Sequence, residues 1–388
     1  MVIVTDPHLR TSLCVIRSLG RRGIEVNVLK KKNTASITMG ELSKYCKGVI
    51  YYKSGENNWL ESVNQRTVLI PMSEASIGYF SKKKEDLKRR IRLLIPDFES
   101  FELARNKDKL LRLSIKIGCP VPQSFFVNNL REVNKLKDEV NYPCIIKVRN
   151  EERIEFCNRY IKVNTREEFV DSYLKVHKIQ ELPLIQEYIE GEPVGFFALY
   201  DEKSKVKAVF AHRRLRESRP TGGPSTFCEG INYNYRNIGK YGLKLLKALK
   251  WKGVAMVEFR IDKRDNVPKL MEVNPRFWGS TPLAIHSGVD FPYLLYKLAC
   301  REEFPQIFKY KIGKKVRFLY ADLHSFRLYV KYLKRKRRFS FICRFLRDFL
   351  NPSIKEGLFE WDDLPSSIHI IKESIFSDIS KLFKKIGN

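Results

Sequence analysis

Apolar residues in the first hundred positions follow the periods of strands and helices in turn. A β-branched run, Val2–Thr5, is followed by apolar positions at helical spacing over 10–19 and by a second strand-like run over 24–29. Strand, helix and strand in this order are typical of a parallel sheet covered by helices. Two further short runs, at 49–52 and 67–71, have the length of strands. The pattern therefore predicts an α/β lobe at the start of the chain.

The turn after the first predicted strand indicates what this lobe does not bind. Its sequence, TDPHLRTS, contains no glycine. Dinucleotide-binding lobes carry a glycine-rich loop at this turn, because the backbone must approach the pyrophosphate closely. We therefore expect a Rossmann-like lobe over residues 1–105 that does not hold a nicotinamide cofactor.

The middle of the chain mixes helical and strand-like patterns. Helical spacing recurs in three segments, 108–117, 235–249 and 291–300. Strand-like runs occupy seven segments, 124–127, 143–148, 184–188, 194–200, 206–212, 253–262 and 269–274. The chain as a whole is predicted to be α/β (α+β).

One pair of these strands carries an unusual set of polar residues. The stretch GVAMVEFRID, residues 253–262, alternates strictly between two faces. The following KRDNV has turn-forming residues, and the next strand extends to Asn274. A hairpin centred on Asp265 would therefore place Glu258 directly opposite Glu272.

Two opposed carboxylates repel each other and require a cation nearby, since directly opposed Cβ atoms lie about 4.5–5.5 Å apart. In MEVNPR, Glu272, Asn274 and Arg276 occupy every second position and share one face. Carboxylate and amide oxygens suit Mg²⁺ or Mn²⁺ shared with phosphates, and the arginine fork suits a phosphate or carboxylate. The alternative is an exposed sheet face whose charges are solvated or paired with Arg260.

Two lysines stand where an anion would be a natural partner. Lys147 lies inside the apolar run PCIIKV, and a buried ammonium is costly without a partner. Lys109 follows RNKD at the start of a predicted helix, where a cation opposes the helix dipole. Each also has a structural explanation, because strand lysines often extend their ammonium to solvent and helix lysines are commonly solvated.

Two further segments join strands to polar turns. LIQEYIEGEP passes from an apolar run into a turn at Glu190–Gly191, where an exposed backbone could meet an adenine edge and Glu192 a ribose. AHRRLRESRPTGGPS groups arginines, Arg213 and Arg214 among them, before a Gly-Gly turn that could cradle an anion with its backbone amides. Alone, these segments describe a strand end and a basic loop.

The net charge, the cysteine count and the absence of long apolar runs restrict the class of protein. The 388 residues carry a formal charge of +29, which favours anionic partners without choosing among nucleotides, nucleic acid and acidic membranes. The eight cysteines form no C-x-x-C pair, so a reduced intracellular protein without a zinc site is expected. The start lacks the pattern of a signal peptide, and no run of about 20 apolar residues predicts a transmembrane helix.

The order of these motifs resembles that of ATP-grasp enzymes. Lys109 in KDK, Lys147 in CIIK, the QEYIEGE hinge, Glu258 in VEFRID and MEVNPR follow one another over residues 108–300. The sequence is most similar to the branch of carbamoyl-phosphate synthase and biotin carboxylase, and within it to stand-alone carboxylate-amine ligases found with cell-envelope polysaccharide genes. The RRLRE…PTGGPS loop supports the narrower match.

The resemblance implies a domain organisation and a role for each motif. The lobe at 1–105 would precede an ATP-grasp domain at 106–312, with a small nucleotide lobe at about 120–190 and a magnesium and substrate lobe at about 191–312. Phosphate and nucleotide contacts are implied for Lys109, Lys147, Gln186, Glu187, Ile189 and Glu192. The metal ligands would be Glu258, Glu272 and Asn274, the catalytic arginines Arg276 and Arg214, and the substrate loop would contribute Arg213, Gly222 and Gly223.

The implied reaction is ATP-dependent ligation. A small-molecule carboxylate attacks the γ-phosphate of ATP with Mg²⁺ (or Mn²⁺), and an amine then attacks the acyl phosphate. Cell-envelope, polysaccharide or peptide biosynthesis is the setting that the resemblance suggests. One departure concerns the flap at 149–160, whose sequence contains no glycine, whereas many family members have a glycine-rich flap there. The alternative function is a catalytically weak or inactive nucleotide-sensing protein that binds nucleic acid or an anionic membrane.

The last part of the chain, 313–388, is predicted to be a basic helical extension. Between residues 327 and 350, aromatic and aliphatic residues are interleaved with Lys and Arg. A helix of this kind could pack on the body, lie on an anionic membrane or, less favoured, bind nucleic acid. We expect a cytoplasmic protein, with peripheral contact at the inner face of the membrane as one option. The oligomeric state stays open, a homodimer being one possibility.

Overall fold

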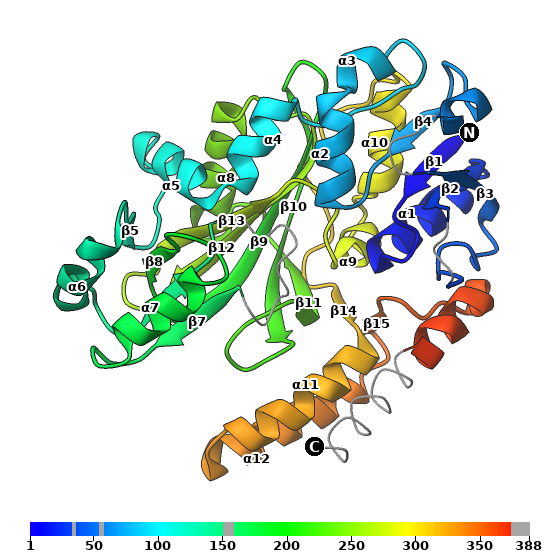
Figure 1. Cartoon of the computed structure of the whole chain (residues 1–388). Coiled ribbons are helices and arrows are strands. Elements are labelled where there is room, and N and C mark those ends of the chain that lie inside the picture. Colours follow the sequence, from blue (N-terminus) through cyan, green and yellow to red (C-terminus); the bar gives the residue numbers. More distant parts are fainter. Residues whose placement is uncertain (33–35, 54–57, 150–158, 374–388) are drawn as a thin grey trace.

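The computed structural model describes residues 1–32, 36–53, 58–149 and 159–373, which form three sheets and a helical extension (Figure 1). The first sheet is parallel, with strand order β3-β2-β1-β4. Its strands are β1 (Val2–Thr5), β2 (Val26–Lys31), β3 (Cys46–Tyr52) and β4 (Val68–Ile70). Its helices are α1 (Arg10–Gly20), α2 (Glu74–Lys82) and α3 (Lys84–Leu87). The predicted parallel lobe is thus present, and its boundary near residue 105 stays a prediction.

The second sheet is small and antiparallel, with strand order β5-β8-β6-β7. Its strands are β5 (Ser124–Phe125), β6 (Cys144–Lys147), β7 (Tyr160–Val163) and β8 (Leu184–Glu187). Helices α6 (Leu130–Glu139) and α7 (Phe169–His177) complete a separate core with it, centred on buried Phe169 and Tyr173. This arrangement gives the small lobe its own hydrophobic centre.

The third sheet has seven strands in the order β13-β12-β9-β10-β11-β14-β15. They are β9 (Gly191–Tyr200), β10 (Val206–Glu217), β11 (Ser225–Ile231), β12 (Gly253–Asp262), β13 (Pro268–Asn274), β14 (Lys315–Arg317) and β15 (Lys355–Glu356). The strands from β13 to β14 pair antiparallel, and β15 adds in parallel.

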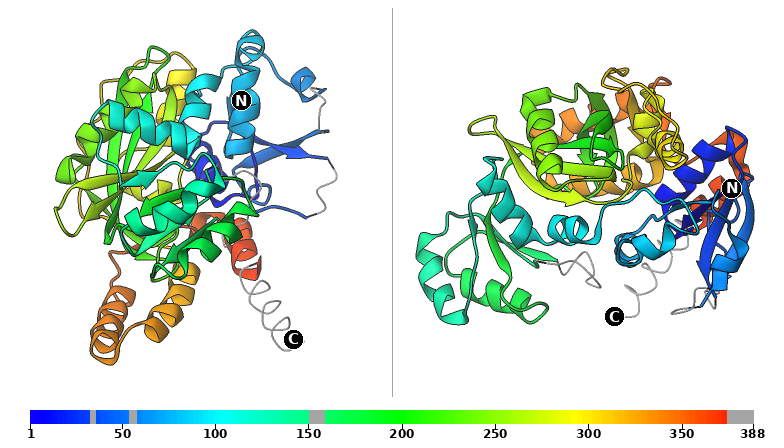
Figure 2. Two further views of the ribbon diagram at one scale, coloured as in Figure 1. Left: turned by 60° about the vertical axis from the view of Figure 1, so that its left-hand side comes forward. Right: turned by 90° about the horizontal axis from the view of Figure 1, so that it is seen from above.

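The alternation in the sequence assigns the two faces of this sheet to two cores. Val257 and Phe259 face a core shared with α4 (Phe98–Arg105), α5 (Lys107–Lys116) and α8 (Ile238–Ala248). Val254 and Met256 face a second core that includes α9 (Thr281–His286), α10 (Phe291–Ala299) and the first lobe. The first lobe and the large sheet therefore share one hydrophobic core, and the two lie side by side in both views of Figure 2.

A β-bulge sets the register of the β12–β13 hairpin. Near the turn, Phe259 pairs with Leu270, so the hairpin turns half a residue earlier than a centre on Asp265 would require. The register then shifts by one residue at Met271, and Glu258 pairs with Glu272. Without the bulge, Glu258 would face Met271, because a one-residue slip exchanges the two faces of a strand.

The C-terminal extension contains two long helices rather than one. Helices α11 (Leu319–Tyr332) and α12 (Arg335–Phe349) form an antiparallel pair, called here the C-terminal helical hairpin, which extends away from the body (Figure 1). Phe326 of α11 packs against Phe341 and Phe345 of α12, with ring centroids 5.8 and 4.3 Å apart. The chain then returns to the first lobe, where Asp363 accepts a hydrogen bond from Arg17 at 2.7 Å.

The predicted strands are present, but several elements were not expected from the sequence. Helix α8 begins at Ile238 instead of Tyr235, because Asn237 has a left-handed backbone with φ +66° that a helix cannot continue. The elements that lacked a clear period were missed, namely β7, β11, β14, β15, α2, α3, α4, α6, α7 and α9. Within the described residues, no helix is long and apolar enough to cross a membrane.

Candidate active site at the carboxylate pair

The predicted pair of opposed carboxylates is present at the edge of the large sheet. Glu258 on β12 and Glu272 on β13 are direct cross-strand partners. Asn274 donates from Nδ2 to Oε1 of Glu272 at 2.9 Å, and Arg276 donates from Nη2 to Oδ1 of Asn274 at 3.1 Å. The three polar side chains of MEVNPR are therefore joined on one face, and Glu258 lies beside them.

Arg214 connects this edge to the neighbouring strand β10. Its Nη2 lies 2.5 Å from Oε2 of Glu258, and its Nη1 donates to Glu217 and to the carbonyl of Gly223, each at 3.2 Å. Burial alone would lower the pKa of Arg214, but Glu258 and Glu217 outweigh it and raise that pKa above its ordinary value. Arg214 is thus a firmly charged residue at the carboxylate pair.

The two carboxylates differ in protonation tendency although they face each other. Burial raises the pKa of Glu258, and Glu272 raises it further, while Arg214 opposes both. Burial also acts on Glu272, but Lys107, Asn274 and Lys147 together bring its pKa below the ordinary value. Glu258 therefore resists ionisation, whereas Glu272 is stabilised in its ionised form. A further cation between them would stabilise the charged form of both.

The lysine that faces the pair from helix α5 is Lys107, and not Lys109. Lys107 is the first residue of α5, is 8% exposed, and stabilises the charge of Glu272. Lys109, two residues later, is exposed, and its backbone N–H donates to the N-cap residue Asn106 at 3.1 Å. Two residues correspond to about 200° around a helix, so the structure does not bring both lysines to the carboxylates.

Lys147 extends from the small lobe toward the same site. Its Nζ donates to Oε1 of Gln186 at 2.7 Å, and Gln186 donates to Ser124 at 2.9 Å. The charge of Lys147 also contributes to the low pKa of Glu272 on the large sheet. Gln186 is buried, so it positions Lys147 within the small lobe, and its predicted contact with a nucleotide stays a prediction.

The segment after Gln186 is partly engaged within the protein. The backbone N–H of Glu187 donates to the carbonyl of Gln123 at 2.8 Å, and its carboxylate pairs with Arg264 at 2.6 Å. Ile189 is buried in the link between β8 and β9, at the junction of the two lobes. The predicted contact of Glu187 and Ile189 with the adenine edge of ATP stays a prediction.

Glu192 and Arg213 lie on the opposite face of the large sheet from the carboxylate pair. Arg213 pairs with Glu229 across strands at 2.7 Å and approaches Glu192 at 3.5 Å, while Tyr235 donates to Glu192 at 3.1 Å. Arg213 and Arg214 are adjacent in sequence and therefore point to opposite faces. The structure does not bring Glu192 and Arg213 together with the other predicted site residues.

The Gly-Gly turn folds back over the arginines of the site. Gly222 and Gly223 have φ of +126° and +130°, a region that side chains disfavour. A Cβ at Gly222 would lie 3.4 Å from Nη2 of Arg260, and Arg260 pairs with Glu217 at 3.0 Å. Arg260 was the alternative partner predicted for the pair. Its observed partner Glu217 was not predicted, because nothing in the local pattern around Glu217 marks it.

The chain resembles known proteins in sequence and in structure. A family model described as ATP-grasp in the biosynthetic pathway with Ter operon matches residues 184–319. The biotin carboxylase domain of 2-oxoglutarate carboxylase from Hydrogenobacter thermophilus has a TM-score of 0.65 and 15% identity, covering 81% of this chain and 73% of its own. The chain has the ATP-grasp fold. The resemblance inferred from its motifs is thereby confirmed.

Two more known proteins resemble the chain, one in structure and one in sequence. N5-carboxyaminoimidazole synthetase from Staphylococcus aureus, complexed with ADP, has a TM-score of 0.63 and 15% identity over 81% of this chain and 80% of its own. The large chain of carbamoyl phosphate synthase from Thermoanaerobacter pseudethanolicus is 25% identical over 239 residues, 60% of this chain and 22% of the relative. The chain spans between 19% and 28% of the length of the curated relatives it matches.

The donor set fits a hard divalent cation rather than a soft one. The described residues contain no group of three or more His, Cys, Asp and Glu side chains suited to a metal ion. The site instead offers two carboxylates and the amide oxygen of Asn274. Such an oxygen set is incomplete by itself and matches ions that take their remaining ligands from phosphates and water.

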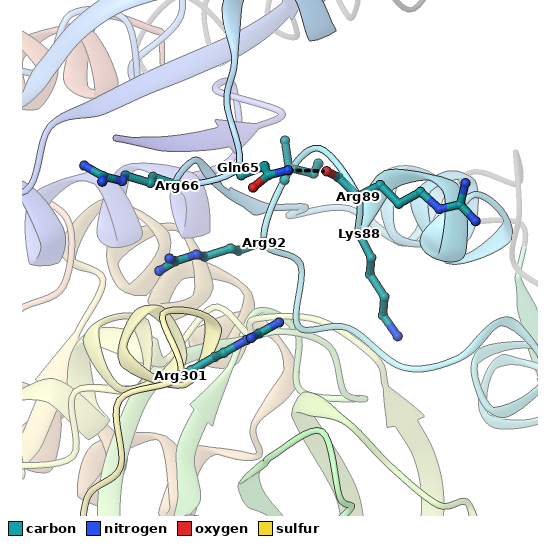
Figure 3. A pocket seen from close by; sticks show the side chains of 7 residues that line it. Gln65, Arg66, Lys88, Arg89, Arg92 and Arg301 are labelled. Atoms are coloured by element: carbon teal, nitrogen blue, oxygen red, sulfur yellow. Dashed lines mark hydrogen bonds between the residues drawn. The ribbon is translucent and has the colours of Figure 1, made fainter.

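A second basic region is separate from this site. A cavity of about 410 Å³ lies between the first lobe and the end of α10 (Figure 3), and its lining residues are Gln65, Arg66, Lys88, Arg89, Ile91, Arg92 and Arg301. Figure 3 shows the head groups of Arg66 and Arg89 pointing in opposite directions, away from the cavity. The cationic groups do not converge, in contrast to those around Glu258 and Glu272.

Proposed function

We propose that the protein is an ATP- and Mg²⁺-dependent ligase that activates a small-molecule carboxylate as an acyl phosphate and couples it to an amine. The observation that carries the proposal is the cross-strand pairing of Glu258 with Glu272, with Arg214, Lys107 and Lys147 around it. Opposed carboxylates surrounded by fixed cations are suited to phosphoryl transfer, in which charge on several oxygens must be offset together. Two of the proteins described above were solved with ADP, one of them with its magnesium salt, which supports the same chemistry.

The residues would divide the reaction between the two lobes. Lys107 and Lys147 would hold the phosphates of ATP, because the positive charges of both act on Glu272 from outside the large sheet. Glu258, Glu272 and Asn274 would hold Mg²⁺, which draws charge from phosphate oxygens when bound. Arg276, joined to Asn274 and 3.4 Å from Glu74 of the first lobe, would stabilise the charged oxygen of the acyl group as the amine attacks.

Arg214 would act as an exchangeable partner of Glu258. In the structure, Nη2 of Arg214 lies 2.5 Å from Oε2 of Glu258 and balances its charge. Nη1 of Arg214 donates to Glu217 and to the carbonyl of Gly223. A bound cation at the carboxylate pair would leave Arg214 free to turn toward a substrate carboxylate. The loop that carries Gly222 and Gly223 would then close one side of that substrate site.

The experiment that tests the proposal is a screen for ADP and phosphate release over panels of carboxylates and amines, with mass spectrometry of the products. Once a productive pair is found, Glu272→Gln should reduce turnover by about a hundredfold or more, since metal ions supply several kcal/mol of transition-state stabilisation.

Glu229→Gln is the matched control for that variant. Like Glu272, Glu229 is a half-buried strand glutamate, but it pairs with Arg213 and lies on the opposite face of the same sheet. It should keep turnover within about twofold, as surface changes away from a site usually do. Equal turnover in Glu272→Gln and the unaltered protein would show that the carboxylate pair is not the catalytic centre.

A further inference from the structure

The outer face of helix α12 carries a row of apolar side chains that the described part of the chain leaves exposed. Phe339, Leu346 and Leu350 are 73%, 52% and 78% exposed, and Cys343 between them is also exposed. Steps of four, three and four residues place all four on one side of a helix. Phe341 and Phe345, on the other side of α12, are buried against α11. Helix α12 is thus apolar on two sides, and one of them has no partner among the residues that the structure describes.

Cations border this exposed row. At 100° per residue, Arg335 lies on one edge of the row and Lys336 and Arg347 on the other. Nine Lys and Arg residues occur between 319 and 350, namely Arg327, Lys331, Lys334, Arg335, Lys336, Arg337, Arg338, Arg344 and Arg347. The same segment contains two carboxylates, Asp322 and Asp348. The outer surface of the C-terminal helical hairpin is therefore apolar along its centre and basic along its margins.

Both carboxylates of the hairpin are directed inward to one arginine. Arg216 of β10 donates to both oxygens of Asp322 at 2.8 Å and to Asp348 at 2.9 Å. Their charges are thus used to fasten the hairpin to the body and do not balance the cations outside. A second copy of the chain would bring the same basic surface, so like charges oppose self-association through this face.

A second exposed apolar row begins in the 3-10 turn Trp361–Asp363 and continues along the helical residues 364–373. It consists of Trp361, Leu364, Ile368 and Ile371, which are 81%, 40%, 45% and 42% exposed. This helix and the C-terminal helical hairpin extend from the same side of the body in Figure 1 and in the left view of Figure 2. A broad partner on that side could contact both rows at once.

We propose that the C-terminal helical hairpin binds the surface of an anionic lipid bilayer, with Phe339, Leu346 and Leu350 inserted at the headgroup level and the flanking cations on the lipid phosphates. Aromatic and aliphatic side chains bordered by Lys and Arg are the features of an interfacial helix. Nucleic acid would use the cations but would leave the aliphatic Leu346 and Leu350 in water. Since Arg214 and Arg216 are two residues apart on β10, the bilayer would lie close to the candidate active site.

Vesicle flotation with the full chain tests the proposal, using phosphatidylcholine vesicles with and without about 30% phosphatidylglycerol. The protein should float with the anionic vesicles and not with the neutral ones. Phe339→Ser with Leu346→Ser and Leu350→Ser should weaken binding by at least about tenfold. Arg335→Gln with Lys336→Gln and Arg347→Gln should weaken it by about a hundredfold, because each cation near the surface contributes roughly a fivefold factor.

The matched control removes three charges elsewhere, with Arg66→Gln, Arg89→Gln and Arg301→Gln at the cavity of Figure 3. It should bind like the unaltered protein. An equal loss in this control would mean that binding follows net charge alone and would overturn the proposal. So would unchanged binding of the serine variant, or displacement of the unaltered protein from vesicles by an equimolar DNA oligonucleotide.

A second measurement does not depend on multiple substitutions being tolerated. Phe339→Trp places a fluorophore at an exposed position, and brominated lipids in anionic vesicles should quench its emission. Tyr51→Trp, at a 51% exposed position of the first lobe, should not gain quenching. Equal quenching at both positions, or none at 339, would contradict the proposed orientation. Neither readout requires ATP or substrate, so failure here is distinguishable from failure of the proposed ligase activity.

Discussion

Arg214 and Arg216, two residues apart on strand β10, both pair with carboxylates, but the two ion-pair clusters have different roles. Arg216 bonds Asp322 through two nitrogens and Asp348 through the third, so each of its three nitrogens has a partner. Arg214 bonds Glu258 and Glu217, but its buried Nε has no hydrogen-bond partner in the part of the chain that the structure describes. Arg216 completes its cluster, whereas Arg214 leaves a carboxylate pair and a donor incompletely satisfied.

The difference shows how one strand serves both stability and chemistry. The bulge at Leu215 lets Arg214 and Glu217 share the site face, while Arg216 points to the C-terminal helical hairpin. A buried ion pair whose members are fully bonded holds structure but gains nothing from a ligand. A cluster whose charged groups are incompletely paired is stabilised when a ligand binds. Such incompletely paired groups are concentrated at functional sites.

The largest expected effect concerns Arg216 and its two aspartates. Arg216→Met leaves Asp322 and Asp348 without their shared cation and should lower the free energy of unfolding by about 3–5 kcal/mol. Arg214→Met should cost less stability, because burial already raises the pKa of Glu258 and this carboxylate can take up a proton when its cation is lost, yet the variant should abolish turnover. Urea unfolding and ADP release measure the two quantities. A greater loss of stability for Arg214→Met would reverse the comparison.

A smaller effect separates the two lysines of helix α5. Lys107→Met removes a buried cation that faces Glu272 and should reduce the affinity for ATP by about tenfold to a hundredfold, since a hydrogen bond to a charged group contributes about 1.5–3 kcal/mol. Lys109→Met should have little effect, because that side chain is exposed. Isothermal titration calorimetry of each variant with Mg-ATP measures this affinity. A stronger effect at Lys109 would return the phosphate contact to the residue expected from the sequence.

A pH series should reveal the raised pKa of Glu258. Because the folded protein holds this proton more tightly than the unfolded chain, the stabilisation by the protonated form is complete below the unfolded pKa and is lost as pH rises through the folded one. Glu258→Gln, which cannot ionise, should therefore gain stability relative to the unaltered protein as pH rises from about 4.5 toward neutrality. Thermal unfolding without metal is the measurement. A constant difference across that range would contradict the direction of the shift.

The smallest expected effect is in the Gly-Gly turn. Gly222→Ala forces a side chain into a disfavoured backbone region next to Arg260 and should cost about 1–3 kcal/mol of stability. Gly279→Ala is the control, because a Cβ there would meet open space and its φ is not positive. Chemical denaturation compares the pair. Equal stability of the two variants would show that the turn is not held in its present form by the arginines.

The local patterns of the sequence determined the elements that position the site. Strict alternation in 253–262 identified the face that carries Glu258, and MEVNPR joined Glu272, Asn274 and Arg276 on one side, because side-chain direction along a strand has a period of two. The order of the motifs was enough for the ATP-grasp fold. These features are short-range, so one sequence contains them.

The tertiary structure alone decided which groups meet. The bulge at Met271 brings Glu258 opposite Glu272 although the turn lies half a residue from its predicted centre. The docking of α5 selects Lys107 over Lys109, and pairing across β10 sends Arg213 away from the site and Arg214 into it. Register, helix rotation and the choice between two faces depend on contacts between segments far apart in the chain, and no local period encodes them.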